Sequence, residues 1–110
     1  MAVKHKSEIK INVGLDENRV PEAILWSADD GNIKDKEIKA AFLSVWNHDE
    51  KETYRVNLWT KDMPINEMKQ FFHQTLVSMQ ETYKVATGDD KMSDTMKDFC
   101  DYFLENMMKS

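Results

Sequence analysis

The sequence predicts an α+β fold, in which a four-stranded antiparallel sheet precedes two C-terminal helices packed on one face of that sheet. Three observations lead to this prediction. The first half alternates apolar and polar residues with a period of two, and the second half repeats apolar residues every three or four positions. The chain of 110 residues is long enough for one core. We therefore expect a single domain over residues 1–110, with the element order β-β-β-β-α-α.

Two strands are predicted in the first 28 residues. In residues 7–15, apolar side chains occupy every second position, which is typical of a strand with one buried face. A polar turn follows, and residues 20–28 form the second strand. Pro21 lies near its start, where a missing N–H does least harm. Asp29-Asp30-Gly31-Asn32 then ends the alternation and indicates a turn.

The segment 35–46 fits both a strand and a helix. Some of its apolar residues stand at helical spacing, whereas Phe42 to Trp46 has the composition of a strand. We assign residues 40–48 to a strand because a charged tip follows them and leads into residues 53–60, a second run rich in β-formers. The two runs are interpreted as a hairpin.

Two helices are predicted in the rest of the chain. The first covers residues 65–87, with Pro64 in its first turn and Gly88 at its end. The second covers residues 93–108, with Asp90 or Ser93 as its N-cap. Each carries an apolar stripe at helical spacing, formed by Met68, Phe72, Leu76, Met79, Tyr83 and Ala86 in the first helix and by Met92, Met96, Phe99, Cys100, Phe103 and Met107 in the second. We expect both stripes to be buried.

The second to fourth predicted strands are apolar on both faces. Two helices on one face leave the other uncovered, and an uncovered apolar patch usually marks a protein or ligand contact. The candidate protein-contact residues are therefore Trp26, Trp46 and Trp59, which all lie in these strands. Alternatively, Trp46 and Trp59 lie singly on the surface or under the N-terminal segment.

Composition and charge disfavour several classes of function. The net charge of −5 disfavours nucleic acids and anionic membrane surfaces, because both are bound by clustered Lys and Arg. No apolar run reaches the length of a membrane span. The first residues carry charges where a signal peptide needs its apolar stretch, and Cys100 is the one cysteine. We expect a cytoplasmic protein in a reducing compartment.

The sequence offers no recognisable catalytic or metal-binding set. His5, His48 and His73 lack a second ligand at metal spacing, and Cys100 is interpreted as a small buried hydrophobe. Acidic residues form one stripe on the second helix, interpreted as a solvated face or, alternatively, as a docking surface for a basic partner: Asp94, Asp98, Asp101 and Glu105. We expect no catalytic residue, cofactor or metal, and hence no enzyme.

Three segments carry a resemblance to a known family. "LWTKDMPINEMKQFFHQTLVSM" at 58–79, "VPEAILWSADDG" at 20–31 and "MKDFCDYF" at 96–103 resemble the gliding-motility protein GldC family. The resemblance covers nearly the whole chain. It implies a small soluble accessory protein of the bacterial gliding-motility machinery, whose partners are other proteins of that machinery. The family has no established catalytic residues to carry over.

A second likeness is architectural. Four antiparallel strands followed by two helices resemble the order of the SecB-like export chaperones, which is an analogy at the level of fold. It gives the alternative function, a SecB-like chaperone or peptide-binding protein. The leading hypothesis is a non-enzymatic protein-interaction module that forms a homo-oligomer, either a dimer or a tetramer.

Overall fold

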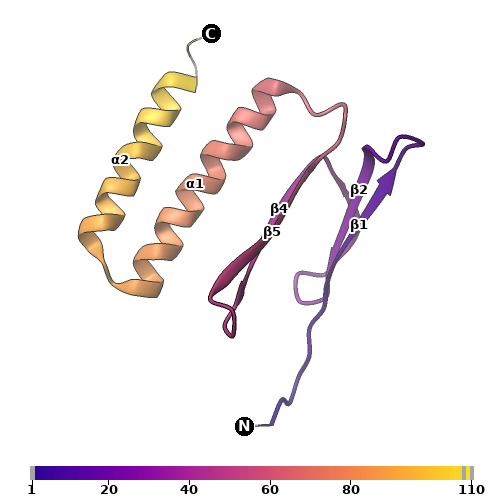
Figure 1. Ribbon diagram of the computed structural model, residues 1–110, viewed down its shortest axis with the longest axis horizontal. Helices are drawn as coiled ribbons and strands as arrows, with labels where there is room; N and C mark the ends of the chain where they lie inside the picture. Colours follow the sequence, from indigo (N-terminus) through magenta and orange to yellow (C-terminus); the bar gives the residue numbers. More distant parts are fainter. Residues whose placement is uncertain (1, 108, 110) are drawn as a thin grey trace. The chain divides into compact units, whose positions relative to one another are not determined.

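A computed structural model describes residues 2–107 and 109 and divides the chain into two compact units, Met1–Met63 and Pro64–Ser110. Strands occur in the first unit and helices in the second (Figure 1). The α+β class, the antiparallel strands and the two C-terminal helices are confirmed. The elements are β1 (Ile9–Leu15), β2 (Pro21–Ala28), β3 (Ile33–Ile38), β4 (Ala40–Asn47), β5 (Glu52–Trp59), α1 (Ile65–Thr87) and α2 (Asp90–Met107).

The strands form two sheets, one with the order β1-β2-β3 and one that pairs β4 with β5. The prediction of a single four-stranded sheet is therefore wrong. The missed strand is β3, in which four consecutive charged residues, 34–37, separate two isoleucines and hide any apolar alternation. β4 and β5 lie within one residue of the predicted hairpin strands, so the helical interpretation of 35–46 is wrong as well.

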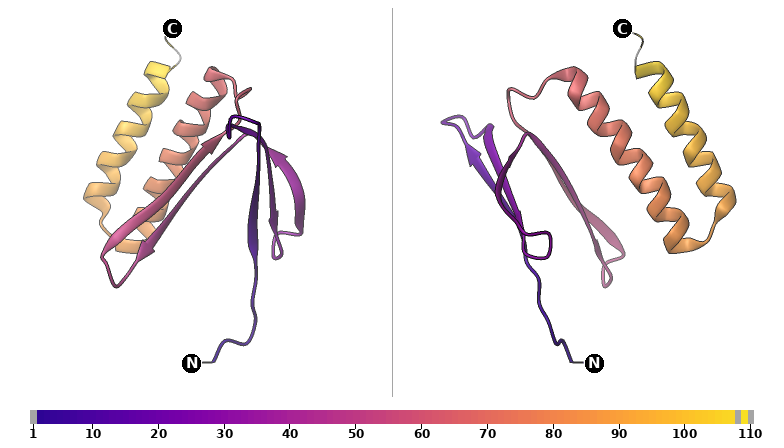
Figure 2. Two further views of the ribbon diagram at one scale, coloured as in Figure 1. Left: turned by 45° about the vertical axis from the view of Figure 1, so that its right-hand side comes forward. Right: turned by 180° about the vertical axis from the view of Figure 1, so that it is seen from behind.

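A single residue, Lys39, separates β3 from β4 and explains the division into two sheets. Before it, Ile38 pairs with Ile24 of β2, and after it Ala40 pairs with Trp59 of β5. The Lys39 carbonyl itself accepts a hydrogen bond from the Thr60 N–H at 2.8 Å. The chain thus changes its pairing partner within three residues. Figure 2 shows the two sheets meeting at this passage and diverging from it.

The three-stranded sheet has one apolar face. Ile11 of β1 pairs with Trp26 of β2, and Val13 pairs with Ile24, which is completely buried. This is the alternation predicted for the first strand. It ends at Leu15, where the register shifts. Ile24 is the centre of the small core of this unit.

Four non-glycine residues among those described have a positive φ, and all lie in turns or irregular parts of the strand unit. They are Arg19, Asn32, Asp35 and Lys51. Asn32 closes the predicted turn after β2, where its N–H donates to the Asp29 carbonyl. Asp35 lies where the β2–β3 register shifts, and the Ser27 hydroxyl accepts a hydrogen bond from its N–H at 2.8 Å. Asp35 therefore marks a β-bulge in β3.

The helical unit is an antiparallel pair joined at Gly88 and Asp89, as both figures of the whole chain show. α1 has the predicted bounds, and Gly88 ends it with a φ of 71°. α2 begins at Asp90, and the Asp89 carboxylate accepts the Met92 N–H at 3.0 Å. Asp89 is therefore the N-cap, where Asp90 or Ser93 was predicted. The predicted helix end at Met108 lies outside the described residues.

The two helices pack along a contact centred on Ser93 and Cys100, which are 0 % and 4 % exposed. Gln80 of α1 donates to the Ser93 hydroxyl at 2.7 Å. The His73 ring stacks on Phe103 with a centroid distance of 6.2 Å, so this histidine takes part in the contact between the helices. Cys100 is buried as predicted.

α2 covers the apolar stripe of α1 only in part, and none of the described residues of α1 is buried. Phe72 and Met79 are 43 % and 54 % exposed, so the helix pair alone does not bury this stripe, and its burial against a sheet stays a prediction. One residue of the stripe, Leu76, lies at the helix contact beside Met96 and Cys100 of α2. Gln80 and His73 contribute to the same contact. Packing of the helix pair on a sheet, and a single domain over residues 1–110, stay predictions.

Candidate protein-contact surface

The three predicted contact residues occupy two different sheets. Trp46 and Trp59 are 61 % and 52 % exposed and lie on the same face of the β4–β5 hairpin. Trp46 pairs with Thr53 and Trp59 with Ala40, six positions apart in register, so the two indoles stand ~20 Å apart along the strands. Trp26 is half-buried on the apolar face of the other sheet. The structure therefore places two of the three on one surface, at its two ends.

The opposite face of the hairpin is apolar from its base up to the pair before the polar Asn47 and Glu52. Four large side chains on this face are 45–50 % exposed, and they form two directly opposed cross-strand pairs. The pairs are Leu43 with Val56 and Val45 with Tyr54. Ala41 and Leu58 extend the same face and are half-buried. None of the three predicted contact tryptophans lies on this face. The sequence signal for it is that apolar residues occupy both the odd and the even positions of the two hairpin strands.

The tip of the hairpin is polar and held by local hydrogen bonds. The Tyr54 hydroxyl donates to the Glu50 carboxylate, and this bond raises the pKa of Tyr54 above its usual value. The Asn47 side chain accepts the Glu50 N–H at 3.0 Å. Lys51 and His48 lie 3.3 Å apart at Nζ and Nδ1. These contacts order the turn that joins the two apolar strands.

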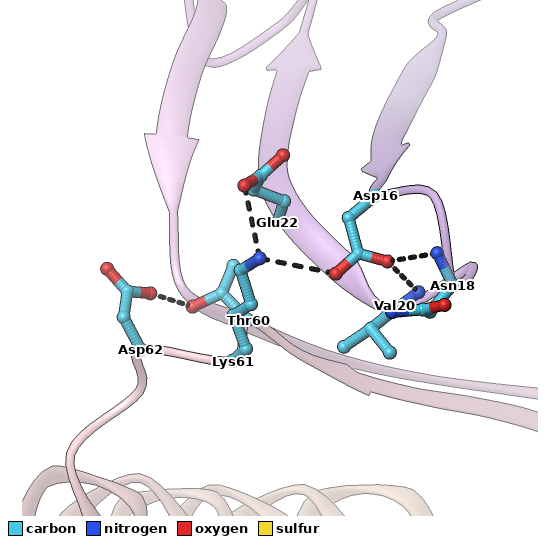
Figure 3. Close-up of polar contacts among 7 residues, drawn as sticks. All are labelled: Asp16, Asn18, Val20, Glu22, Thr60, Lys61 and Asp62. Atoms are coloured by element: carbon cyan, nitrogen blue, oxygen red, sulfur yellow. Dashed lines mark hydrogen bonds and ion pairs between the residues drawn. The ribbon is translucent and has the colours of Figure 1, made fainter.

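A polar cluster fixes the base of the hairpin to the turn before β2 (Figure 3). Lys61 Nζ lies 3.2 Å from both the Asp16 and Glu22 carboxylates. The other Asp16 oxygen accepts the N–H groups of Asn18 and Val20 at 2.8 and 3.0 Å. The bonds from Val20 and Asn18, together with the Lys61 ammonium, hold the pKa of Asp16 below its usual value. The two carboxylates raise the pKa of Lys61.

A further carboxylate, that of Asp62, closes the same junction. It accepts hydrogen bonds from Lys39 Nζ at 2.8 Å and from the buried Thr60 hydroxyl at 2.6 Å. The bond from Lys39, followed by that from Thr60, lowers the pKa of Asp62. Each carboxylate at this junction is thus satisfied by partners within the strand unit. The geometry indicates that these carboxylates have a structural role at the junction.

A shallow hollow of about 270 Å³ lies beside this junction. Its lining is mostly apolar and includes the exposed side chains of Trp59 and Val20. The other lining residues are Pro21, Asn57, Leu58 and Lys61. The volume falls just under the ~300–1,000 Å³ typical of small-molecule sites. It is large enough for one apolar side chain of a bound segment.

No group of three or more His, Cys, Asp or Glu side chains among the described residues is arranged to hold a metal ion. Neither helix, over the residues described, is long and apolar enough to cross a membrane.

Comparison with known proteins identifies the family. A family model described as "Gliding motility-associated protein GldC-like" matches residues 21–109. The chain belongs to this family. The match runs from the start of β2 to the end of α2 and confirms the resemblance seen in the sequence. No curated protein matches the chain. No solved structure matches it, so the SecB-like order remains an analogy.

Proposed function

We propose that the chain is a non-enzymatic accessory protein of the bacterial gliding-motility machinery and acts there as a protein-interaction module. The GldC-like family supplies the process. One observation carries the interaction role: six large hydrophobic side chains on the β4–β5 hairpin are each at least 45 % exposed. They are Leu43, Val45, Trp46, Tyr54, Val56 and Trp59.

The two hairpin faces differ in the contact that each would make. The hairpin face that carries Leu43, Val45, Tyr54 and Val56 is a continuous strip of aliphatic and tyrosine side chains. It is suited to the apolar face of a partner element. The opposite face presents Trp46 and Trp59 as separate anchors at the two ends of the strands, with polar residues such as Arg55 between them. Tryptophan and arginine are among the residues most enriched where interfaces derive their affinity. The partners we propose are other motility-machinery proteins.

Three further properties belong to this proposal. The chain works in the cytoplasm, and it forms a homo-oligomer, a dimer or a tetramer. It needs no cofactor, because its role is to bind. The histidines support a non-catalytic role, since His73 stacks on Phe103 and His48 lies in the hairpin tip beside Lys51.

Complementation of a gliding bacterium tests the role of the tryptophan face. A strain lacking this gene is supplied with the wild type or with Trp46→Ala/Trp59→Ala. Loss of a tryptophan anchor from an interface costs about 2 kcal/mol or more, which weakens binding about 30-fold. We expect the variant to restore little or no spreading, although its circular dichroism spectrum matches that of the wild type.

A matched control is available on the second helix. Tyr102 is 62 % exposed, close to the value for Trp46, and lies outside the hairpin. Tyr102→Ala should restore gliding. A photo-crosslinking residue at position 46 should repeatedly trap one motility protein in living cells. A photo-crosslinking residue at position 102 should not trap that protein. Full gliding by the double tryptophan variant would refute the assignment of this face.

The second candidate is a chaperone or peptide-binding protein, and the hollow beside Trp59 is the observation that favours it. It lies next to an exposed, apolar strand, so an extended segment could place one side chain in it. Aggregation of an unfolded test protein, followed by light scattering, should then slow at stoichiometric amounts of the chain. Unchanged aggregation at a tenfold excess would dismiss this candidate.

A further inference from the structure

β3 is the outer strand of the three-stranded sheet, and its outer edge is the surface of interest. The strand order places β2 on its inner side. No other described strand pairs with residues 33–38, and only the following residue, Lys39, bonds across to Thr60. A sheet edge of this kind presents unpaired backbone N–H and C=O groups to any strand that can align with it.

The hydrogen-bond pattern shows which residues of β3 direct their backbone outward. The Asp29 N–H donates to the Glu8 carbonyl, so Asp29 faces β1, and Ala28, one residue earlier, faces β3. The β2 residues facing β3 therefore pair with Ile33, Lys36 and Ile38. Lys34 and Glu37 are left to direct their backbone groups away from the sheet.

The bulge at Asp35 makes this outward pair possible. In a regular strand, residues three apart point in opposite directions. The extra residue in β3, opposite Ser27, brings Lys34 and Glu37 into the same phase. The Asp35 N–H is already bonded to the Ser27 hydroxyl, so the bulge leaves no unsatisfied donor there.

The charges on this edge are complementary to themselves. Residues 33–38 read Ile-Lys-Asp-Lys-Glu-Ile, and all four charged residues are exposed. When a second copy runs antiparallel, Lys34 lies opposite Glu37 and Asp35 opposite Lys36, while the isoleucines meet at both ends. Every charged residue then faces an opposite charge. Directly opposed ion pairs of this kind stabilise a sheet.

Charged or bulged edges usually prevent strand pairing. Protection works when like charges meet, as in edges lined by lysine. Here the two lysines are balanced by one aspartate and one glutamate. Lys34, Lys36 and Glu37 also form no ion pair with any other described residue, so they are free to meet a partner.

We propose that two copies of the chain associate through β3, paired antiparallel about a two-fold axis with Lys34 of each copy opposite Glu37 of the other. This inference rests on the proposed homo-oligomer and assigns its surface. The pairing joins two three-stranded sheets into one of six strands and leaves the β4–β5 hairpin available to another protein. The contact is only ~20 Å long, so it is smaller than the ~1,200 Å² of stable interfaces and is reversible.

Sedimentation velocity over a range of concentrations and at two salt concentrations tests the pairing. The wild type should dimerise at high concentration, and raising the salt from about 0.05 M to about 0.5 M should weaken the dimer, because exposed ion pairs are screened. Lys34→Glu places two glutamates opposite each other at both ends of the dimer contact, and Glu37→Lys places two lysines opposite each other there. Each variant alone should dimerise at least tenfold more weakly than the wild type.

Mixing the two variants restores the complementary charges. In the mixed dimer, each acidic edge meets a basic edge, so association should return to the wild-type level or above. Lys97→Glu makes the same change of charge on α2 and should dimerise as the wild type does.

Two results would overturn the assignment of this edge while a homo-oligomer still stands: single variants that dimerise like the wild type, or a mixture no stronger than its components. A wild type that stays monomeric at every concentration would overturn both the edge pairing and the homo-oligomer.

Discussion

Replacement of Ile24 by alanine should remove most of the stability of the strand unit. Ile24 has no exposed surface, and it lies where β2 pairs with both β1 and β3. The change deletes three carbon groups, worth ~2.4 kcal/mol at ~0.8 kcal/mol each. A residual cavity of ~50 Å³ would add ~1.2 kcal/mol. The free energy of unfolding should therefore fall by roughly 3–4 kcal/mol.

Ile9→Ala is the matched control, because Ile9 belongs to the same apolar face but is 72 % exposed. Only about a quarter of its transfer free energy is recovered by folding, so its replacement should cost ~0.7 kcal/mol. Urea titration followed by tryptophan fluorescence compares the two variants. With a slope of ~1.5 kcal/mol/M, the two midpoints should differ by ~2 M.

Equal midpoints for the two alanine variants would refute the placement of the core at Ile24. If Ile24→Ala does not fold, Ile24→Val provides the same comparison at smaller cost. It removes one carbon group and should lower the free energy of unfolding by ~1 kcal/mol.

Three further outcomes are expected. Gly88→Ala should destabilise the helical unit by ~1 kcal/mol in urea titration, because the φ of 71° at this position strains any residue with a Cβ, although that Cβ would meet nothing within 4 Å. Gly88→Asn should cost less, since asparagine tolerates this conformation better. Equal stability of all three proteins would contradict the strain. Cys100 should react slowly with an aromatic disulfide reagent at neutral pH and rapidly in urea, because burial raises the pKa of its thiol; fast native labelling would show that α1 and α2 separate readily. The lowered pKa of Asp16 contributes stability above the usual value of 3.8 that is lost as pH falls through the folded pKa. Asp16→Asn should therefore flatten the fall in melting temperature between about pH 5 and about pH 2, and an unchanged pH profile would remove Asp16 as its source.

The elements with a strong local signal were predicted from the periodicity of apolar residues and from the residues that mark the ends of helices and strands. Residues 65–87 were predicted with the bounds that the structure shows, because Pro64 and Gly88 mark both ends. The hairpin was found because a charged tip separates two runs of β-formers. Alternation also placed Trp46 and Val45 on opposite faces, as the cross-strand pairs require.

β3 could not be found in the same way, because its sequence lacks any apolar alternation. Lys34 to Glu37 contains only charged residues, and this strand exists through its pairing with β2 and the bulge at Asp35. Both are non-local features. The N-cap of α2 was predicted at Asp90 or Ser93 and lies at Asp89. Asp89 and Asp90 are equally good caps in composition, so the sequence does not separate them.

The contact surface was predicted only in part. The sequence named all three tryptophans without deciding which of them lie outward. Trp46 and Trp59 are exposed, whereas Trp26 is half-buried beside Ile11 of β1. Sequence pattern states which side chains share a face, and it does not state which face another strand covers.

The passage of one strand between two sheets at Lys39 has a consequence for how this unit opens. Ile38, Lys39 and Ala40 are bonded to β2 on one side and to the segment around β5 on the other. When either sheet opens as far as this junction, the opening disturbs backbone hydrogen bonds that also hold the other sheet. Amide hydrogen exchange should therefore release β2 and β5 in one step near the junction, whereas their far ends exchange separately. Two sheets joined through the single residue Lys39 should therefore open as one cooperative unit near the junction.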